Sequence, residues 1–253
     1  MGVEVGLPIQ AGGELLFSIL KEWLQDCGKH HTDHKFASDE KELPTRVLDV
    51  QSPEVPSRLR LYESNGEHGK YMALSHCWGE DEHRRPLSTT TVNKNARCES
   101  ISLRDLPKTF QDAVKVTRML GIRYLWIDSL CILQDNENDW ETESQRMETV
   151  FANAFCTIAA TSAKDSWDGF LVCQSIKQSV KLVDKSVNPP LSVYACEVGG
   201  NFKNDVGSAE LNRRAWVLQE RALSPRTIHF TAAQTYWECG SAIRCDNLLQ
   251  MVK

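Results

Sequence analysis

The chain has 253 residues, a formal net charge of −5 and a sequence pI of about 5.8. A weakly acidic chain has no electrostatic attraction to nucleic acid or to an anionic membrane, so we expect neither as a partner. The length allows one large domain or two small ones. A chain of this size buries about 70–75% of its unfolded surface, so no metal or disulfide is needed to hold it together.

Nine cysteines are spread through the chain without the regular spacing of a disulfide framework. Their odd number, and the position of Cys131 and Cys156 inside apolar runs, favour reduced and buried thiols. No apolar run approaches the length of a membrane span, and the first residues lack a basic segment followed by an apolar one. We therefore expect a cytoplasmic protein without a membrane segment.

An amphipathic helix is predicted near Glu14–Cys27 in the first part of the chain. A histidine-rich turn follows it, with Cys27, His30, His31 and His34. A structural zinc site needs four well-placed nitrogen or sulfur ligands, and no second pair of such residues stands at a matching spacing. The pattern therefore favours a solvated loop over a metal site, and no metal is expected.

The segment between residues 70 and 170 alternates apolar strands with amphipathic helices. The run YMALSHCWG begins as a strand and breaks at Gly79, after which a polar stretch predicts a long loop. A helix follows that Thr109 can cap together with Asp112, and Gly121 ends it. The run YLWI then predicts a strand buried on both faces, with Asp128 at its carboxyl end.

A second helix is predicted from about Asp139 to Asn153, with Asn138 or Asp139 as its cap. The run FCTIAA predicts the next buried strand. Alternation of strands and helices along the chain predicts an α/β fold with a mostly parallel sheet that is flanked by helices.

The last third of the chain adds further β structure in this prediction. The stretch NPPLSVYAC suits a short strand region, Trp216 to Leu223 a short helix, and TIHF and QTYWEC a pair of strands. Glu220 and Arg221 are candidates for a salt bridge into the central segment. We divide the chain into an N-terminal helix and linker (1–69), a main domain (70–240) and a tail (241–253), and we expect this tail to be a truncated end.

Polar residues follow two of the predicted strands at their carboxyl ends. Ligands of open parallel sheets bind beyond the carboxyl ends of the strands, so side chains that follow two neighbouring strands can meet across one crevice. The candidate substrate-binding residues are Ser75, His76, Trp78 and Gly79 after the first strand, and Trp126, Asp128 and Ser129 at the end of the second.

Glu143 is the candidate catalytic residue, because it lies inside the apolar stripe of its own helix. At about 100° per residue, it falls beside the face formed by Trp140, Met147, Phe151 and Ala154. A carboxylate facing a core is either held by a structural partner or kept there for chemistry. The structural alternative is a buried ion pair with an arginine, and the candidates are Arg123, Arg214 and Arg221.

The other candidate residues also have structural explanations that the sequence leaves open. Asp128 can close the strand end with an Asx turn, and Trp78 and Trp126 can be core residues. A thiol hydrolase that uses Cys77 beside His76 is disfavoured, because neighbouring residues on a strand point to opposite faces. No Gly-x-Ser-x-Gly turn is present for a serine hydrolase either.

Four blocks together resemble the HET domain of fungal heterokaryon-incompatibility proteins. They are YMALSHCWG, LPKTFQDAVKVTRMLGIRYLWIDSLCILQD, DWETESQRMETVFANAFCTIAATSA and RRAWVLQERALSPRTIHF, in the order typical of that family and over residues 70–239. The resemblance implies a role in non-self recognition and programmed cell death. It also implies a core similar to that of TIR domains and flavodoxin.

Some TIR domains cleave NAD with a glutamate, so the resemblance implies NAD as a substrate, and no resident cofactor. Here the segment after TIAATSA is KDSWDGFLVC, which contains aspartates but no glutamate. Either Glu143 on the preceding helix serves instead, or the chemistry differs, or there is none. His76 stands where many family members have tyrosine. The alternative is a non-enzymatic module that signals by self-association, and either version implies an upstream recognition protein as a partner.

Overall fold

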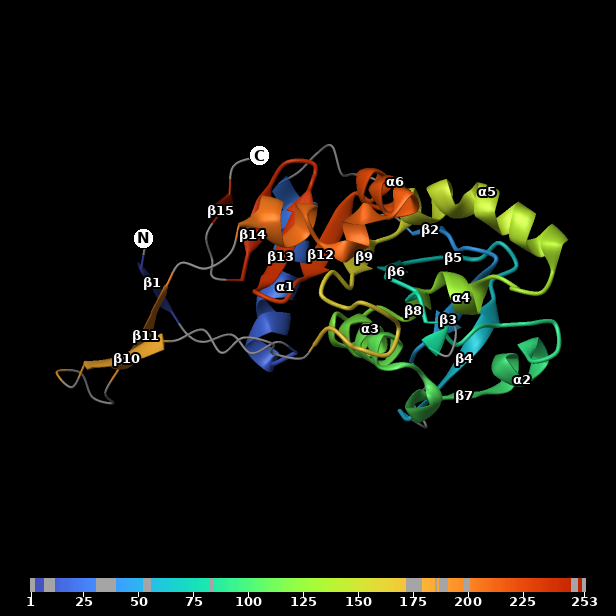
Figure 1. The fold of residues 1–253 in the computed structure, drawn as a ribbon, viewed down its shortest axis with the longest axis horizontal. Coiled ribbons are helices and arrows are strands. Elements are labelled where there is room, and N and C mark those ends of the chain that lie inside the picture. Colours follow the sequence, from blue (N-terminus) through green and yellow to red (C-terminus); the bar gives the residue numbers. More distant parts are fainter. Residues whose placement is uncertain are drawn as a thin grey trace.

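The computed structural model describes residues 3–6, 12–30, 40–51, 56–81, 84–171, 179–184, 186, 191–197, 201–246 and 250–251. Within these residues, a ten-stranded sheet lies between two layers of helices (Figure 1). The strand order is β15-β14-β13-β12-β9-β6-β8-β3-β4-β7. The expected α/β fold with helices on both faces of a sheet is therefore confirmed.

Four parallel strands form the centre of this sheet. They are β6 (Tyr71–Ser75), β8 (Tyr124–Trp126), β9 (Cys156–Ala159) and β12 (Arg226–Phe230), and every residue in them is buried. The pairs β8–β6, β6–β9 and β9–β12 all run parallel. Numbered along the chain, these strands have the spatial order 2-1-3-4, which is the order of flavodoxin-like sheets.

The sheet as a whole is mixed, so the prediction of a mostly parallel sheet was wrong. Six of its nine strand pairs are antiparallel. Helical crossovers, which parallel pairing requires, connect the four central strands, whereas shorter connections join the antiparallel pairs β3–β4, β12–β13 and β13–β14. The outer strands are β3 (Arg46–Asp49), β4 (Arg58–Glu63), β7 (Ile101–Ser102), β13 (Thr235–Cys239), β14 (Ile243–Cys245) and β15 (Gln250–Met251).

The helices cover the two faces of the central strands in pairs. On one face lie α1 (Glu14–His30) and α3 (Lys108–Met119), where the Lys115 ammonium lies over the Phe17 ring. On the other face α5 (Glu137–Asn153) packs against α6 (Ala215–Leu223) (Figure 1). The predicted helices near Glu14–Cys27 and Trp216–Leu223 are confirmed, as is the pairing of TIHF with QTYWEC in β12 and β13.

The remaining elements are short or lie outside the main sheet. A three-stranded sheet contains β1 (Val3–Gly6), β11 (Leu191–Glu197) and β10 (Ser179–Asp184), and a two-stranded one contains β2 (Lys41–Glu42) and β5 (His68–Gly69). Two short α-helices, α2 (Lys94–Glu99) and α4 (Asp128–Cys131), follow β6 and β8. Turns of other helix types are η3 (Leu103–Asp105), η4 (Lys203–Gly207) and η5 (Glu210–Arg213).

The two predicted helix caps differ from the observed ones. Helix α3 begins after Pro107, and the buried Thr109 hydroxyl instead donates to the Asp165 carbonyl oxygen at 3.0 Å. Helix α5 begins after Asn136, whose side chain accepts from the Asp139 backbone N–H at 3.1 Å. Thr109 does not cap the helix, because its hydroxyl binds a residue far away in the sequence, which sequence spacing does not reveal. Gly121 does end α3, with a φ of 77° in the left-handed region.

Buried Asp112 on α3 is expected to stabilise the fold by holding the chain beyond β9. Its Oδ2 accepts from the backbone N–H of Phe170 at 2.9 Å and of Leu171 at 3.0 Å. We expect Asp112→Asn to lower the free energy of unfolding by about 2–3 kcal/mol, because an amide cannot accept these bonds as a charged carboxylate does. Urea denaturation followed by circular dichroism measures this change. Asp105→Asn, at an exposed position, is the control, and an equal loss in both variants would contradict the prediction.

Candidate functional site

The predicted residues that follow β6 and β8 do meet at the carboxyl end of the central strands. The Trp78 indole Nε1–H donates to Asp128 Oδ2 at 2.8 Å. His76 Nδ1 lies 4.0 Å from Asp128 Oδ1. Residues from two different strands are thus brought together at one edge of the sheet, as the parallel arrangement predicts.

Asp128 also organises the backbone at the end of β8. It is the first residue of α4, and its Oδ1 accepts from the Ser129 backbone N–H at 2.6 Å. The Ser129 hydroxyl is buried and donates to the Leu87 carbonyl oxygen at 3.0 Å. Both side chains therefore stabilise the local backbone through hydrogen bonds, and Asp128 additionally fixes the orientation of Trp78.

Gly79 and Trp126 have different environments. Gly79 has a φ of 87°, and a Cβ added there would lie 2.7 Å from the Asp165 Cβ, so only glycine allows the two segments to approach. Trp126 is 1% exposed, and its ring packs edge-on against Phe151 with 5.7 Å between the ring centroids. Trp126 is thus a core residue, which is the structural explanation that the sequence left open for it.

His76 and Cys77 point to opposite sides of the sheet, as expected. The His76 ring packs edge-on against Phe110 of α3, whereas Cys77 contacts Val217 of α6. Burial lowers the pKa of His76, although the Asp128 carboxylate opposes this change, so the imidazole is neutral at pH 7. Burial raises the pKa of the Cys77 thiol, which keeps it protonated. This pair therefore lacks both the geometry and the thiolate that a cysteine nucleophile needs.

Glu220 completes the site from α6. The Ser75 hydroxyl donates to Glu220 Oε2 at 2.5 Å, so the end of β6 is joined to α6. We name Ser75, His76, Trp78, Asp128 and Glu220 the strand-end cluster. The salt bridge predicted for Glu220 with the central segment is not found among the described residues, and a hydrogen bond from Ser75 makes this contact instead. Arg221 binds within the C-terminal part instead, where it pairs with Glu238 at 2.7 Å.

The electrostatic environment of Glu220 favours the protonated acid. Burial raises the pKa of Glu220 to about 7, the nearby Asp128 charge adds to this, and the Ser75 hydrogen bond and Arg214 act against it. No lysine or arginine in the described part of the chain forms a salt bridge with it. Glu220 also lies in the last turn of α6, where the helix dipole disfavours an anion. Such a carboxyl is partly ionised at neutral pH and can exchange protons there.

Glu220 lies near the point where sheets with this strand order bind their ligands. In 2-1-3-4 sheets the chain changes direction between the first and third strands, which here are β6 and β9. A cavity of about 10 Å³ behind Ser75 is lined by Thr157, Ala159 and His229, among other residues. This volume admits about one water molecule, so a larger ligand has to bind on the open edge of the sheet.

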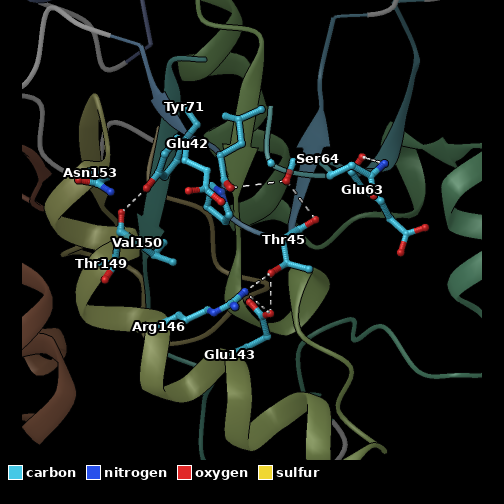
Figure 2. A pocket seen from close by; sticks show the side chains of 14 residues that line it. Glu42, Thr45, Glu63, Ser64, Tyr71, Glu143, Arg146, Thr149, Val150 and Asn153 are labelled. Carbon is cyan, nitrogen blue, oxygen red and sulfur yellow. Dashed lines mark hydrogen bonds and ion pairs between the residues drawn. The ribbon is translucent and has the colours of Figure 1, made fainter. Parts of the chain in front are cut away.

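Glu143 is buried as predicted, at 4% exposure, but it does not belong to the strand-end cluster. Its Oε1 accepts from the Thr45 hydroxyl at 2.7 Å and lies 3.8 Å from Arg146 Nη1 (Figure 2). The three arginines expected for its ion pair bind elsewhere: Arg123 to Asp49, Arg214 to the His76 carbonyl oxygen and Arg221 to Glu238. Its catalytic role stays a prediction.

A metal site is not found in the described part of the chain. No group of three or more histidine, cysteine, aspartate or glutamate side chains is placed there to hold an ion. His31 and His34 of the predicted turn lie outside the described residues, and the side chain of His30 does as well. No helix among the described residues is long and apolar enough to cross a membrane.

Glu220 could have been found from the helix pattern of WVLQERAL. Val217 is buried, and a residue three positions later shares its face of a helix. The same reasoning that selected Glu143 therefore applies to Glu220. The partner Ser75, 145 residues away, could not be read from that pattern.

One comparison with known proteins gives a match. The family model described as "Heterokaryon incompatibility protein (HET)" matches residues 71–220, which begin at the first residue of β6 and end at Glu220. No curated protein and no solved structure gives a significant match.

The raised pKa of Glu220 predicts a specific dependence of stability on pH. The folded state binds this proton more tightly than the unfolded state, where the value is 4.5, so the stabilisation is present below pH 4.5 and is lost as the pH rises to about 7. We expect the free energy of unfolding of the wild type, relative to Glu220→Gln, to fall by an amount on the order of 1–3 kcal/mol from pH 4.5 to pH 8.

Urea denaturation of both proteins at several pH values measures this difference. Glu148→Gln, which neutralises an exposed glutamate of α5, controls for general charge effects. A difference between wild type and Glu220→Gln that stays constant with pH would show an unshifted pKa of Glu220, and one that rises with pH would show a lowered pKa; either result would contradict the prediction.

Proposed function

This chain belongs to the heterokaryon incompatibility (HET) family, and from that premise we propose that it acts in fungal non-self recognition by cleaving NAD, which triggers cell death. The family match spans both Ser75 and Glu220, so the contact between them lies within the family's domain. The observation that carries the enzymatic part is Glu220, a half-buried carboxyl without a salt bridge among the described residues, held by Ser75 at the carboxyl end of β6.

The proposed reaction is hydrolysis of the bond between nicotinamide and ribose. The C1′–N bond breaks, its electron pair passes to the ring nitrogen, and neutral nicotinamide leaves. The positive charge that develops on the ribose is stabilised by a carboxylate, as in glycoside hydrolysis. Water adds to C1′ and its proton passes to Glu220 and then to solvent, so the products are nicotinamide, ADP-ribose and a proton.

The environment of Glu220 suits both parts of this reaction. With a pKa of about 7, a substantial fraction of Glu220 is ionised at neutral pH and available as an anion. Its protonated form is accessible over the same pH range, so the group can release the proton that it accepts. A carboxyl locked in an ion pair would be a weaker base, since a neighbouring cation lowers its pKa.

The other residues of the strand-end cluster position Glu220 and the substrate in this proposal. The Ser75 hydroxyl fixes Oε2 of Glu220, and we assign Oε1 the contact with the ribose. Asp128 holds the half-buried indole of Trp78, which offers a flat apolar surface for a nicotinamide or adenine ring. Trp126 has no part in binding, because its ring is buried in the core.

We expect the purified chain, at high protein concentration, to release nicotinamide from NAD, and Glu220→Gln to lower kcat/KM by at least about 10²-fold. The amide keeps the size of the side chain and its bond from Ser75 but carries no charge, and losing a general base typically has an effect of this size. Nicotinamide release measured by chromatography, with folding checked by circular dichroism, tests this expectation.

Two further variants identify the carboxylate that acts. Glu148→Gln changes an exposed glutamate on α5 and is the matched control. Loss of turnover in Glu143→Gln, with Glu220→Gln active, would instead support the residue chosen from the sequence. No turnover by the folded wild type at any protein concentration would contradict the proposal and favour a module that signals by self-association.

A further inference from the structure

A pocket of about 460 Å³ lies between α5 and two loop segments (Figure 2). Its walls are formed by residues 42–45, residues 63–66, Tyr71 and one side of α5 from Glu143 to Asn153. None of the residues of the strand-end cluster lines it. We name it the Glu143 pocket, and it is separate from the site proposed for NAD.

Glu143 is a buried carboxylate with one unused oxygen in this wall. The Thr45 hydroxyl donates to Oε1 at 2.7 Å, and Arg146 Nη1 donates to that hydroxyl at 3.0 Å. The ion pair of Arg146 with Glu143, at 3.8 Å, also reaches Oε1. No side chain or backbone group of the described residues binds Oε2, and this atom is not among the fully buried ones without a partner, so water in the pocket reaches it. A carboxylate that is 4% exposed and has one oxygen open to a pocket can bind a cationic donor there in place of water.

The charges of the pocket wall indicate whether the group that binds there is a cation or an anion. Three carboxylates, Glu42, Glu63 and Glu143, and one arginine, Arg146, line the pocket. Glu63 is paired with Lys94 at 2.7 Å, so the negative charge of the pocket comes from Glu42 and Glu143. The Arg146 side chain is 60% exposed, so water screens its charge, whereas Glu143 is buried and its charge is screened little. The field inside the pocket is therefore negative near Oε2, and a cation is favoured over an anion.

The rest of the wall indicates the shape of the ligand. Leu43, Pro44 and Val150 supply an apolar surface beside the acidic end. The polar residues Asn65, Thr149 and Asn153 stand around it and can accept further N–H donors. A short alkyl chain with a charged head that carries several N–H groups would satisfy both surfaces.

We propose that the Glu143 pocket binds a small alkylguanidinium, whose planar head donates to Glu143 Oε2 while its alkyl chain lies on Leu43, Pro44 and Val150. A guanidinium fits because it presents several donors in a fixed plane and keeps its charge when partly buried. The group has two sources, a free metabolite of this class or an arginine side chain of another protein. This inference is independent of NAD cleavage at the strand-end cluster.

The test compares two probes of the same shape that differ in charge, n-butylguanidinium and n-butylurea. We expect saturable binding of n-butylguanidinium to the full chain with a dissociation constant of about 1–10 mM, as is usual for a ligand of so few atoms, and at least about tenfold weaker binding of n-butylurea. Chemical-shift changes of backbone amides in a titration measure both constants. N-acetylarginine N-methylamide distinguishes the two sources, since an arginine of a partner protein predicts tighter binding of this probe.

Three variants locate the site. Glu143→Gln keeps the bond from Thr45 but removes the charge, and we expect it to weaken n-butylguanidinium binding at least about tenfold. Asn153→Lys adds a positive charge to the pocket wall and should also weaken n-butylguanidinium binding. The new lysine stands at the last residue of α5, where the helix dipole favours a cation, so this variant serves if Glu143→Gln does not fold. Glu148→Gln on the exposed side of α5 is the matched control and should bind as the wild type does.

Three results would overturn the proposal. Equal binding of n-butylurea and n-butylguanidinium would mean that the pocket does not distinguish a charged ligand from a neutral one. Equal weakening by Glu148→Gln and Glu143→Gln would mean that the probe responds only to net charge. Absence of saturable binding to the folded wild type at 50-fold above the expected constant, on the order of 0.5 M, would mean that Glu143 is buried for structural reasons alone.

Discussion

Burial of four parallel strands on both faces is the constraint on which the rest of this structure depends. Because α1 and α3 cover one face and α5 and α6 the other, β6, β8 and β9 carry mostly apolar side chains, whereas β12 also buries Arg226, Thr227 and His229. Along β6 and β8, polar and ionisable groups stand at the strand ends and meet the helix surfaces there. The strand-end cluster follows from this arrangement, since Ser75 and Asp128 stand at the carboxyl ends of β6 and β8.

Glu220 shows what such a position does to an acid. Helix α6 buries Val217 against the sheet, and Glu220, three residues later, is carried to the same side and loses much of its water. Ser75 gives it one hydrogen bond but no compensating charge, so the carboxyl keeps its proton up to an unusually high pH. Glu143 has different partners, because a hydroxyl and an arginine stand beside it, and we propose that its second oxygen, which lines the pocket, binds a cation.

The sequence predicted the local elements of this fold well and its long-range pairings poorly. The apolar runs of β8 and β9, the helices α3 and α5 and the glycine that ends α3 were all correct, because each depends on residues close in the chain. The antiparallel flanks, the contact of Thr109 with Asp165 and the partners of Glu143 depend on residues far apart. Trp140, expected in the apolar stripe of α5, is 51% exposed. At the site, the meeting of Trp78 with Asp128 followed from sheet topology, but the contact of Ser75 with Glu220 required the position of α6.

The most direct test of this account is a titration of the Glu220 carboxyl itself. Carbon-13 NMR of protein labelled in its glutamate side chains, with Glu220→Gln to assign the signal, gives the midpoint of its protonation. A midpoint near 7 is the result that the account predicts, because burial without a charged partner raises the pKa. A midpoint near 4.5, the value for an ordinary glutamate, would contradict it, since Glu220 would then be a solvated carboxylate without the acid–base character on which the proposed reaction depends.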